Sequence, residues 1–225
     1  MDDDTEVDAY ASAAAQSYLA RIDGTFVEHV ARLLAPAEPV AGRALDLGCG
    51  PGQITIMLAR RWPSLRFTAI DAARAMIDQA RRDAASAGVD IDFEVFRLGP
   101  DGHPRLPYED GAFELVTCNS VLHHLADPLG ALNEMARVCR PGGAVLLRDL
   151  RRPSPIAYPA HVRLYGRHYS GEMRRLYEAS VRAAYGLPEL RALLEGSALN
   201  DGRSRVFRKG RVHQGIERSA APRTA

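Results

Sequence analysis

The sequence lacks the features that define several common classes of protein. Its three cysteines, Cys49, Cys118 and Cys139, are too few and too scattered for a disulfide framework or a zinc site. The 29 basic and 28 acidic residues leave a net charge of +1, whereas a dedicated nucleic-acid-binding protein shows a strong basic bias. No apolar run approaches the length of a membrane span, and the acidic start "MDDDTEVDAY" does not have the pattern of a signal peptide. We therefore expect a cytoplasmic protein without a metal ion, whose partners are neither nucleic acids nor membranes.

Short apolar runs alternate with helical patterns along most of the chain. We expect strands at 43–48, 65–71, 91–98, 113–120 and 144–150, and helices at 53–62, 73–88 and 128–140. This alternation is typical of βαβ units, which form a parallel sheet covered by helices on both faces. Residues 203–217 alternate around Lys209 and Gly210, which predicts a terminal antiparallel hairpin. A chain of 225 residues of this kind fits one doubly wound α/β domain.

The stretch "ALDLGCGPGQ" places three glycines directly after the first expected strand. Gly48, Gly50 and Gly52 remove side chains, so that a ligand can approach the backbone. A P-loop is excluded because the Gly-Lys-[Ser/Thr] that it requires is absent. The dinucleotide pattern G-x-G-x-x-G is not matched either, because Gln53 stands where the third glycine belongs. Pro51 also lacks an amide that a pyrophosphate would use.

The second expected strand ends in Asp71, about twenty residues beyond the glycines. A carboxylate at this place can accept hydrogen bonds from both hydroxyls of a ribose. The alternative role for Asp71 is to cap the helix that follows. Together with the glycine loop, Asp71 favours a nucleoside with free ribose hydroxyls and no strong phosphate site.

Three motifs in order carry a family resemblance. They are "LDLGCGPGQ", then "AID" with "AMIDQAR", then "LPYEDGAFELVTCNSVLHHLADPLGALNEMARVCRPGGAVLL". Over residues 43–150 the chain resembles the class I S-adenosylmethionine-dependent methyltransferases, in the ubiquinone/menaquinone-biosynthesis-like (type 11) subgroup. The resemblance implies a Rossmann-like fold with a seven-stranded, mostly parallel sheet that ends in an antiparallel strand. It also implies S-adenosyl-L-methionine as cofactor and S-adenosyl-L-homocysteine as its product.

The resemblance further implies how the cofactor contacts the chain. The glycine loop would pass under its methionine and ribose parts, Asp46 would border its amino-acid part, and Asn119 would lie near the sulfonium and the carboxylate. At the adenine end, relatives usually read "GDA" with "LPF" shortly after, but this chain reads "RLGPDGHPRLPY". Asp101 is the candidate there, with a surface turn as the alternative. The expected cofactor-binding residues are Asp46, Gly48, Cys49, Gly50, Gln53, Asp71, Ala72, Met76, Leu98, Gly99, Asp101, Asn119 and Ser120.

Two histidines follow the fourth expected strand in "CNSVLHHL". A histidine pKa near 6.5 suits a general base at neutral pH, and a base is needed only when the methyl acceptor must lose a proton. We expect His124 first, and His123 second, as catalytic residues. The alternative is that these histidines are carried without acting as a base, as is often the case in the family.

Residues 152–185 are rich in Tyr, His and Arg, at a place where the family commonly inserts a substrate cap. The N-terminal helix of the family commonly forms a lid. Both segments would line the acceptor pocket, and the alternative is a pair of amphipathic surface helices. The candidate substrate-binding residues are Tyr10, Tyr18, Arg21, His124, Tyr158, His161, Tyr165 and His168.

These expectations divide the chain into five parts. They are a helical lid at 1–40, a cofactor-binding core at 41–152, a helical cap with a return helix at 153–200, a hairpin at 201–217 and a disordered tail at 218–225. The predicted function is methyl transfer to a small-molecule acceptor, with an aromatic metabolite favoured, by a monomer or homodimer. The acceptor atom stays open among O, N, C and S, because the fold does not fix it. The alternatives are an NAD-dependent Rossmann oxidoreductase and a cofactor-binding partner protein without catalysis.

Overall fold

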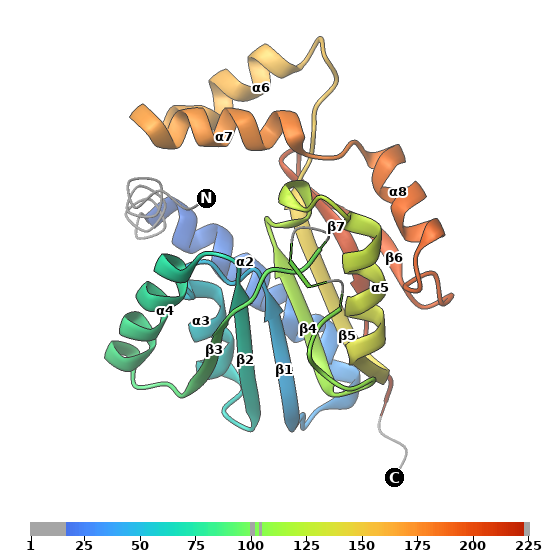
Figure 1. Ribbon diagram of the computed structural model, residues 1–225. Coiled ribbons are helices and arrows are strands. Elements are labelled where there is room, and N and C mark those ends of the chain that lie inside the picture. Colours follow the sequence, from blue (N-terminus) through green and yellow to red (C-terminus); the bar gives the residue numbers. More distant parts are fainter. Residues whose placement is uncertain (1–16, 100–101, 104, 223–225) are drawn as a thin grey trace.

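A seven-stranded sheet forms the centre of the protein, seen in a computed structural model that describes residues 17–99, 102–103 and 105–222 (Figure 1). The strands lie in the order β3-β2-β1-β4-β5-β7-β6. Their bounds are β1 Gly42–Leu47, β2 Leu65–Asp71, β3 Ile91–Val95, β4 Phe113–Asn119, β5 Cys139–Leu150, β6 Arg205–Lys209 and β7 His213–Arg218. Strands β1 to β5 are parallel, and β7 is antiparallel to both β5 and β6. The predicted doubly wound sheet with an antiparallel terminal hairpin is confirmed.

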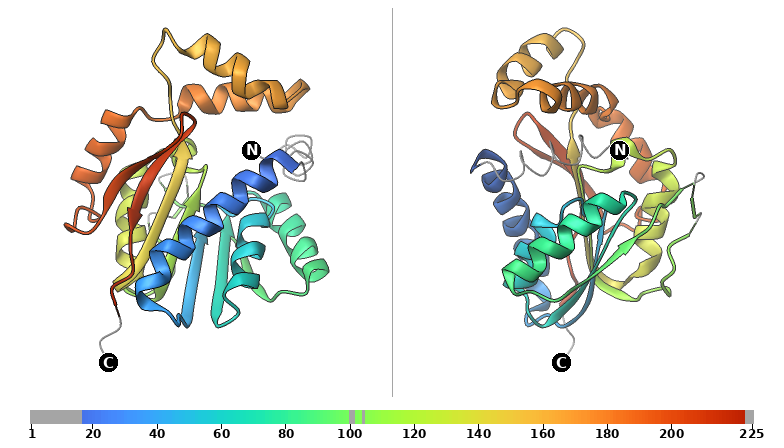
Figure 2. Two further views of the ribbon diagram at one scale, coloured as in Figure 1. Left: turned by 180° about the vertical axis from the view of Figure 1, so that it is seen from behind. Right: turned by 60° about the vertical axis from the view of Figure 1, so that its left-hand side comes forward.

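Helices cover both faces of the sheet (Figure 2). Their bounds are α2 Ser17–Leu34, α3 Gln53–Arg61, α4 Arg74–Ala87, α5 Pro128–Val138, α6 Tyr158–Tyr165, α7 Gly171–Ala183 and α8 Leu187–Gly196. On one face, α2 and α3 bury Phe26 and Leu58 against Leu146. On the other face, α5 and α8 bury Met135 and Leu190 against the sheet. This burial of apolar side chains on both sides explains why the central strands read as nearly continuous apolar runs.

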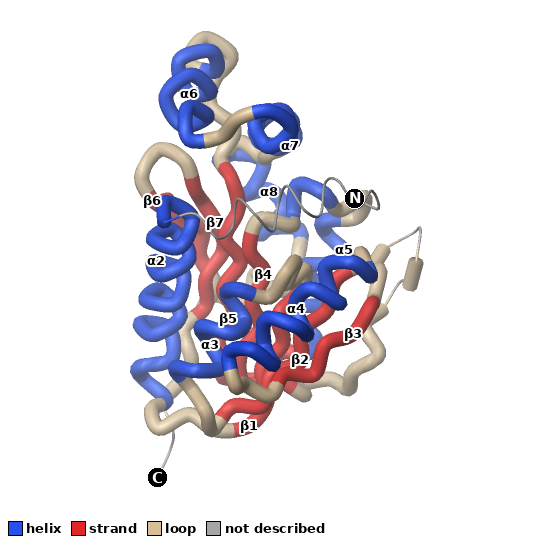
Figure 3. The backbone as a smooth tube through the Cα atoms, turned by 90° about the vertical axis from the view of Figure 1, so that its left-hand side faces the viewer, coloured by secondary structure: helices blue, strands red, loops and turns tan. Residues whose placement is uncertain are grey.

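Helices α6 and α7 stand apart from these layers, beyond the carboxyl ends of the parallel strands (Figure 3). They fall within the predicted cap at 153–200. The predicted lid at 1–40 is described only from residue 17. From Phe26 onward α2 packs in the core, because Phe26, Val30, Leu33 and Leu34 are buried.

Several boundaries differ from the sequence prediction, among them the end of β3, which lies at Val95 rather than at residue 98. The helix expected to reach residue 140 ends at Val138, because Cys139 already pairs with Phe113 in the β4–β5 ladder. The tail expected to be disordered from residue 218 is ordered through the described part of the chain, to residue 222. Arg218 belongs to β7, and the amide of Ala220 donates to the Leu33 carbonyl oxygen at 2.8 Å. Main-chain hydrogen bonds and burial of the small Ala220 side chain hold this segment against α2.

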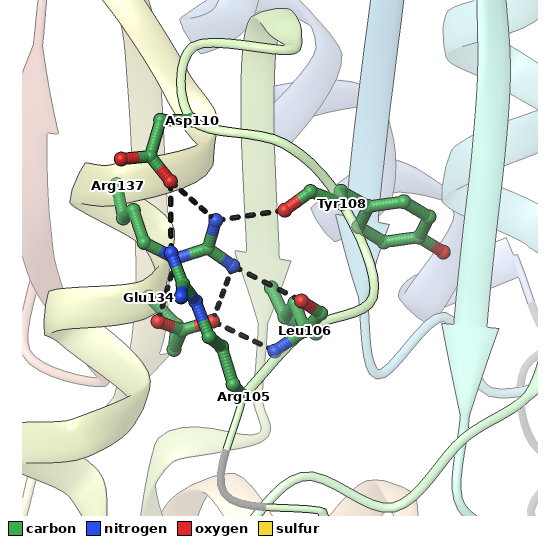
Figure 4. Close-up of polar contacts among 6 residues, drawn as sticks. All are labelled: Arg105, Leu106, Tyr108, Asp110, Glu134 and Arg137. Carbon is green, nitrogen blue, oxygen red and sulfur yellow. Dashed lines mark hydrogen bonds and ion pairs between the residues drawn. The ribbon is translucent and has the colours of Figure 1, made fainter.

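A polar clamp fixes the loop that precedes β4 onto α5 (Figure 4). Arg137 donates through Nη1 to the carbonyl oxygen of Tyr108 at 2.7 Å and through Nη2 to that of Leu106 at 3.1 Å. Glu134 accepts from the Leu106 amide at 2.7 Å and also pairs with Arg137 at 2.6 Å. Residues 105–112 of this loop form no helix or strand, so these side chains pair with backbone groups that have no partner in a sheet.

Candidate active site

A cavity of about 630 Å³ lies between the carboxyl ends of the parallel strands and the cap helix α7. Strands β1 and β4 are neighbours in the middle of the sheet, and the order of the strands reverses between them. In open α/β sheets, ligands bind in the crevice at this switch point. The volume lies within the range of sites that bind cofactors and small molecules.

The glycine loop forms the floor of this cavity, and two of its glycines are required by geometry. Gly48 has φ 74° and Gly52 has φ 85°, conformations that side chains other than glycine rarely adopt. A Cβ atom at Gly48 would also collide with the Val121 side chain, and one at Gly52 would lie 2.9 Å from the Ala80 Cβ. Close packing against the loop after β4 and against α4 therefore sets the shape of the loop.

Asp46 is buried at the end of β1, with 3% of its surface exposed. Thr55 donates a hydrogen bond to its Oδ2, and Thr117 donates to its Oδ1 at 2.8 Å. Burial raises the pKa of the Asp46 carboxyl. Asp46 borders the cavity, but these contacts give it the structural task of tying α3 and β4 to β1.

Asp71 stands at the end of β2 and holds two loop amides. Its Oδ2 accepts from the amide of Gly50 and its Oδ1 accepts from that of Ala73, both at 2.9 Å. A carboxylate has about four acceptor positions, so each oxygen can take one further hydrogen bond. Burial raises the pKa of Asp71. The helix-capping contact and the predicted ribose contact are therefore compatible in the same side chain.

Of the three residues predicted to contact the adenine, only Leu98 lines the cavity in the described part of the chain. Leu98 lines it together with Phe96 and Arg97, which the sequence reading did not single out. Gly99 is absent from the wall as far as the described residues define it, and its amide donates to the His103 carbonyl oxygen instead. Asp101 lies outside the described residues.

The loop after β4 is strained and points into the cavity. Ser120 has φ 59°, an unusual value for a residue other than glycine. Asn119 accepts a hydrogen bond at Oδ1 from Arg148 Nε at 2.8 Å. Both residues line the cavity.

His123 and Asp149 form a buried pair at the cavity wall. Asp149 Oδ1 lies 2.6 Å from His123 Nδ1, and its Oδ2 accepts from the His123 amide at 3.0 Å. Only 1% of the His123 side chain and 4% of the Asp149 side chain are exposed. A carboxylate only accepts, so Nδ1 carries the proton and Nε2 is left as an acceptor in the neutral ring. Nε2 is buried and has no hydrogen-bond partner among the described residues.

His124 also lines the cavity, with its ring centroid 3.9 Å from that of His123. Burial, reinforced by the neighbouring His123, lowers the pKa of His124 to about 4. Of the two histidines expected from the sequence, His123 is the one whose ring is oriented by a carboxylate, that of Asp149.

The cap contributes a different set of side chains from the set that the sequence suggested. Tyr165 lines the cavity, but Arg21, Tyr158, His161 and His168 are not part of its wall as described. Tyr158 instead donates to the Glu178 carbonyl oxygen, and His161 lies 3.3 Å from the Tyr177 hydroxyl, both within the cap. Tyr10 lies outside the described residues, as does the side chain of Tyr18.

The structure brings most of the predicted cofactor-binding residues together at one cavity. The wall includes Asp46, Gly48, Cys49, Gly50, Gln53, Asp71, Ala72, Met76, Leu98, Asn119 and Ser120. The tyrosine-rich segment was expected to line the acceptor pocket, and Tyr169 and Tyr177 do belong to the wall. Sequence reasoning missed other wall residues on α2, β5, α7 and the hairpin, namely Ile22, Asp23, Arg148, Leu150, Met173, Leu176, Ala179, Ser180, Ala183, Val212 and His213. Two features of the sequence could have indicated some of these wall residues. Residues 173, 176, 180 and 183 follow helical spacing, and Arg148 is a charge inside an apolar strand.

Comparison with known proteins defines the class. Residues 45–147 match the methyltransferase domain family. A demethylmenaquinone methyltransferase of Deinococcus radiodurans is 34% identical over 162 residues, which are 70% of this chain and 65% of that protein. One of Thermus thermophilus is 32% identical over 153 residues, 68% of this chain and 67% of that protein. The chain therefore belongs to the S-adenosylmethionine-dependent methyltransferases, among relatives from menaquinone and ubiquinone biosynthesis.

Solved structures agree on the fold. The plantazolicin methyltransferase BpumL, in complex with a pentazolic substrate analog and S-adenosylhomocysteine, superimposes with a TM-score of 0.70 at 12% identity. That likeness covers 96% of this chain and 90% of BpumL. A methyltransferase of Aquifex aeolicus gives a TM-score of 0.59 at 20% identity, over 87% of this chain and 89% of the other. The chain spans 43%, 65% and 60% of the length of three curated relatives that it matches.

Two further findings concern the part of the chain that the structure describes. No helix there combines the length and the apolar character that crossing a membrane requires. Within the same residues, no three His, Cys, Asp or Glu side chains are grouped so that they could hold a metal ion.

Proposed function

We propose that this protein transfers a methyl group from S-adenosyl-L-methionine to a hydroxyl group of a small, preferably aromatic, acceptor. The observation that carries this proposal is the His123–Asp149 pair, which belongs to the wall of the same cavity as the glycine loop and Asp71 and whose Nε2 has no hydrogen-bond partner among the described residues. Proton removal is needed for a hydroxyl acceptor, and the pair is arranged as a general base with its orienting carboxylate.

The residues at the sheet side of the cavity fit the proposed cofactor. Asp71 has free acceptor positions for two ribose hydroxyls, and the glycine loop brings the backbone close to the ligand. Leu98, Met76 and Phe96 offer apolar surface for an adenine. When bound, S-adenosylmethionine supplies a methyl group on a sulfonium, which is already a good leaving group. The protein then has to align the acceptor, exclude water and remove a proton.

His123 has the geometry for the proton step. Its Nε2 takes the proton of the acceptor hydroxyl, and Asp149 keeps Nδ1 protonated and stabilises the imidazolium that forms. Tyr165, Tyr169 and Tyr177 line the opposite side of the cavity and offer a surface against which an aromatic acceptor can stack.

The experiment that tests this proposal replaces the base. Purified protein is incubated with labelled S-adenosylmethionine and a panel of phenols, alcohols and amines, and the product of the best acceptor is identified by mass spectrometry. His123→Gln is expected to lower kcat by about 10²–10⁴-fold. The affinity for S-adenosylhomocysteine should stay unchanged, because the ring lies beside the acceptor.

His124→Gln is the matched control, because it removes the neighbouring ring and leaves the Asp149 contact in place. Its kcat should stay within a few-fold of the wild type. Full activity in His123→Gln, or a methylated amine as the sole product of the panel, would contradict the proposed mechanism. Binding of NAD but not of S-adenosylhomocysteine would instead favour the oxidoreductase alternative.

A further inference from the structure

Three tyrosines form an aromatic wall on the cap side of the cavity. Tyr165 comes from the end of α6, Tyr169 from the connection between α6 and α7, and Tyr177 from the middle of α7. The ring centroids of Tyr169 and Tyr177 lie 5.0 Å apart, at an interplanar angle of 34°. Among the described residues, none that the cap contributes to the cavity wall carries a charge. The cap side therefore selects an acceptor by shape and aromatic contact rather than by charge.

His161 lies behind this aromatic wall and contacts two of its three tyrosines. The residue is 7% exposed and is absent from the cavity wall as described. Its Nε2 lies 3.3 Å from the Tyr177 hydroxyl, and its ring centroid lies 4.7 Å from that of Tyr165. His161 thus joins α6 to α7 at the place where the two helices line the cavity.

The contact of His161 with Tyr177 is made at the tip of the tyrosine ring. Only 9% of Tyr177 is exposed, and a phenol and a neutral imidazole can form a hydrogen bond in either tautomer of the imidazole. Burial, together with the charge of Arg151, lowers the pKa of His161, so its ring is neutral at neutral pH. A hydrogen bond at the tip of a ring restricts the rotation of the side chain and so fixes the direction of the ring face.

We propose that His161 is a positioning residue, which makes the cavity selective for aromatic acceptors by holding the rings of Tyr165 and Tyr177. Contacts between aromatic rings depend on their relative orientation as well as on the area that they bury. A wall of rings in fixed positions therefore favours a flat aromatic ligand over a saturated ligand of similar outline. The inference rests on the proposed function for the statement that this ligand is the methyl acceptor, but it can be measured as binding, without turnover.

A matched pair of alcohols tests this inference. 2-Naphthol and decahydro-2-naphthol have the same two-ring skeleton and one hydroxyl, but only the first is aromatic. Calorimetry measures the dissociation constant of each alcohol from the complex of the protein with S-adenosylhomocysteine. We expect the wild type to bind 2-naphthol at least about fivefold more tightly than its saturated counterpart.

His161→Phe is the decisive variant, because it keeps a ring beside Tyr165 and removes the nitrogen that meets Tyr177. Its preference for 2-naphthol should fall to within about twofold of none. Tyr177→Phe removes the other partner of the same contact and should have the same effect. The double variant should show no further loss, because the two changes break one interaction.

Two further variants provide the rescue and the control. His161→Gln retains a side-chain group that can hydrogen-bond to the Tyr177 hydroxyl, so it should keep the wild-type preference to within about twofold. His168→Gln is the matched control, because His168 is an exposed histidine of the same cap that lies outside the described cavity wall. Its two dissociation constants should equal those of the wild type.

A merely structural role of His161 would give a different result. A loosened cap would weaken the binding of both alcohols together and leave their ratio unchanged, and this outcome would overturn the inference. A wild-type complex that binds neither alcohol, or both equally well, would overturn it too, as would a full preference in His161→Phe. The proposed function would stand in each of these cases, because none of them concerns S-adenosylhomocysteine binding or methyl transfer. A wild type that does not bind S-adenosylhomocysteine would instead contradict the proposed function, and the same pair of alcohols, titrated into the protein alone, would still decide this inference.

Discussion

Asp71, at the end of β2, both holds the glycine loop and has acceptor positions for a ligand. A test of ligand binding therefore has to be separated from a test of stability. Asp71 holds the amides of Gly50 and Ala73, and it has free acceptor positions toward the cavity. Asp71→Ala should lower the affinity for S-adenosylhomocysteine at least about tenfold, because two charge-assisted hydrogen bonds to the ribose are lost. Loss of the two loop contacts should lower the free energy of unfolding by about 1–3 kcal/mol.

Calorimetry and thermal unfolding measure the two effects of Asp71→Ala separately. Asp90→Asn is a suitable control, because Asp90 is an exposed carboxylate that lies outside the cavity wall. An unchanged dissociation constant in Asp71→Ala, with the fold intact, would leave Asp71 as a helix-capping residue only.

Asp23 should also affect stability, with a sign that depends on pH. Its pKa is raised from 3.8 to about 6 by burial, so the folded state holds the proton more tightly than the unfolded state. The folded protein is thus progressively destabilised as pH rises from about 4 through 6, when the buried carboxyl ionises. Asp23→Asn should therefore raise the free energy of unfolding by about 1–2 kcal/mol at pH 7.5 and leave it nearly unchanged at pH 4. Thermal unfolding at the two pH values checks this, and an equal change at both would contradict it.

At the same scale, the sequence predicted that the two histidines lie at the cavity, and both belong to its wall. It did not predict which of them is oriented by a carboxylate. The choice depends on Asp149, which is 26 residues away and meets His123 only through the register of β4 with β5. Asp23 and Arg148 likewise reach the same cavity wall only through tertiary packing, because they lie 125 residues apart in the chain.

Among the structural elements, the loop before β4 is held in place by hydrogen bonds from Arg137 of α5. Arg137→Met removes hydrogen bonds to two backbone carbonyls and leaves Glu134 without its cationic partner. We expect a loss of about 2 kcal/mol in the free energy of unfolding, and a Tm lower by roughly 4–8 °C. Arg175→Met is the control, because Arg175 forms an ion pair on the surface with 78% of its side chain exposed. Equal Tm changes in the two variants would show that the clamp adds nothing to stability.

The elements themselves were predictable to different degrees. Strand β2 and helix α4 match their predicted bounds within one residue, because apolar periodicity and the left-handed Gly88 cap define them locally. The start of β5 was not predictable, because "RPGG" ends a helix by local rules and the pairing of Cys139 with Phe113 is a tertiary contact. The inner face of α7 was missed for a related reason. Tyr and Arg on a helix indicate an interface, but only the fold shows that the interface is a cavity wall.

At the scale of the whole molecule, the cavity is lined by parts of the chain that are far apart in the sequence. The glycine loop, α2, the loop after β4 and the cap helix α7 all contribute to its wall, so a bound cofactor should stabilise them together. A ligand at 100 times its dissociation constant adds about 2.7 kcal/mol to the free energy of unfolding, which is roughly 5–11 °C in Tm for a chain of this size. S-adenosylhomocysteine should produce a shift of this size in thermal unfolding. NAD at the same concentration should produce none, because the glycine loop lacks the third glycine and Pro51 lacks an amide. Asp71→Ala should abolish most of the shift at a fixed ligand concentration, whereas Asp90→Asn should retain it. A shift with NAD and none with S-adenosylhomocysteine would contradict the proposed cofactor.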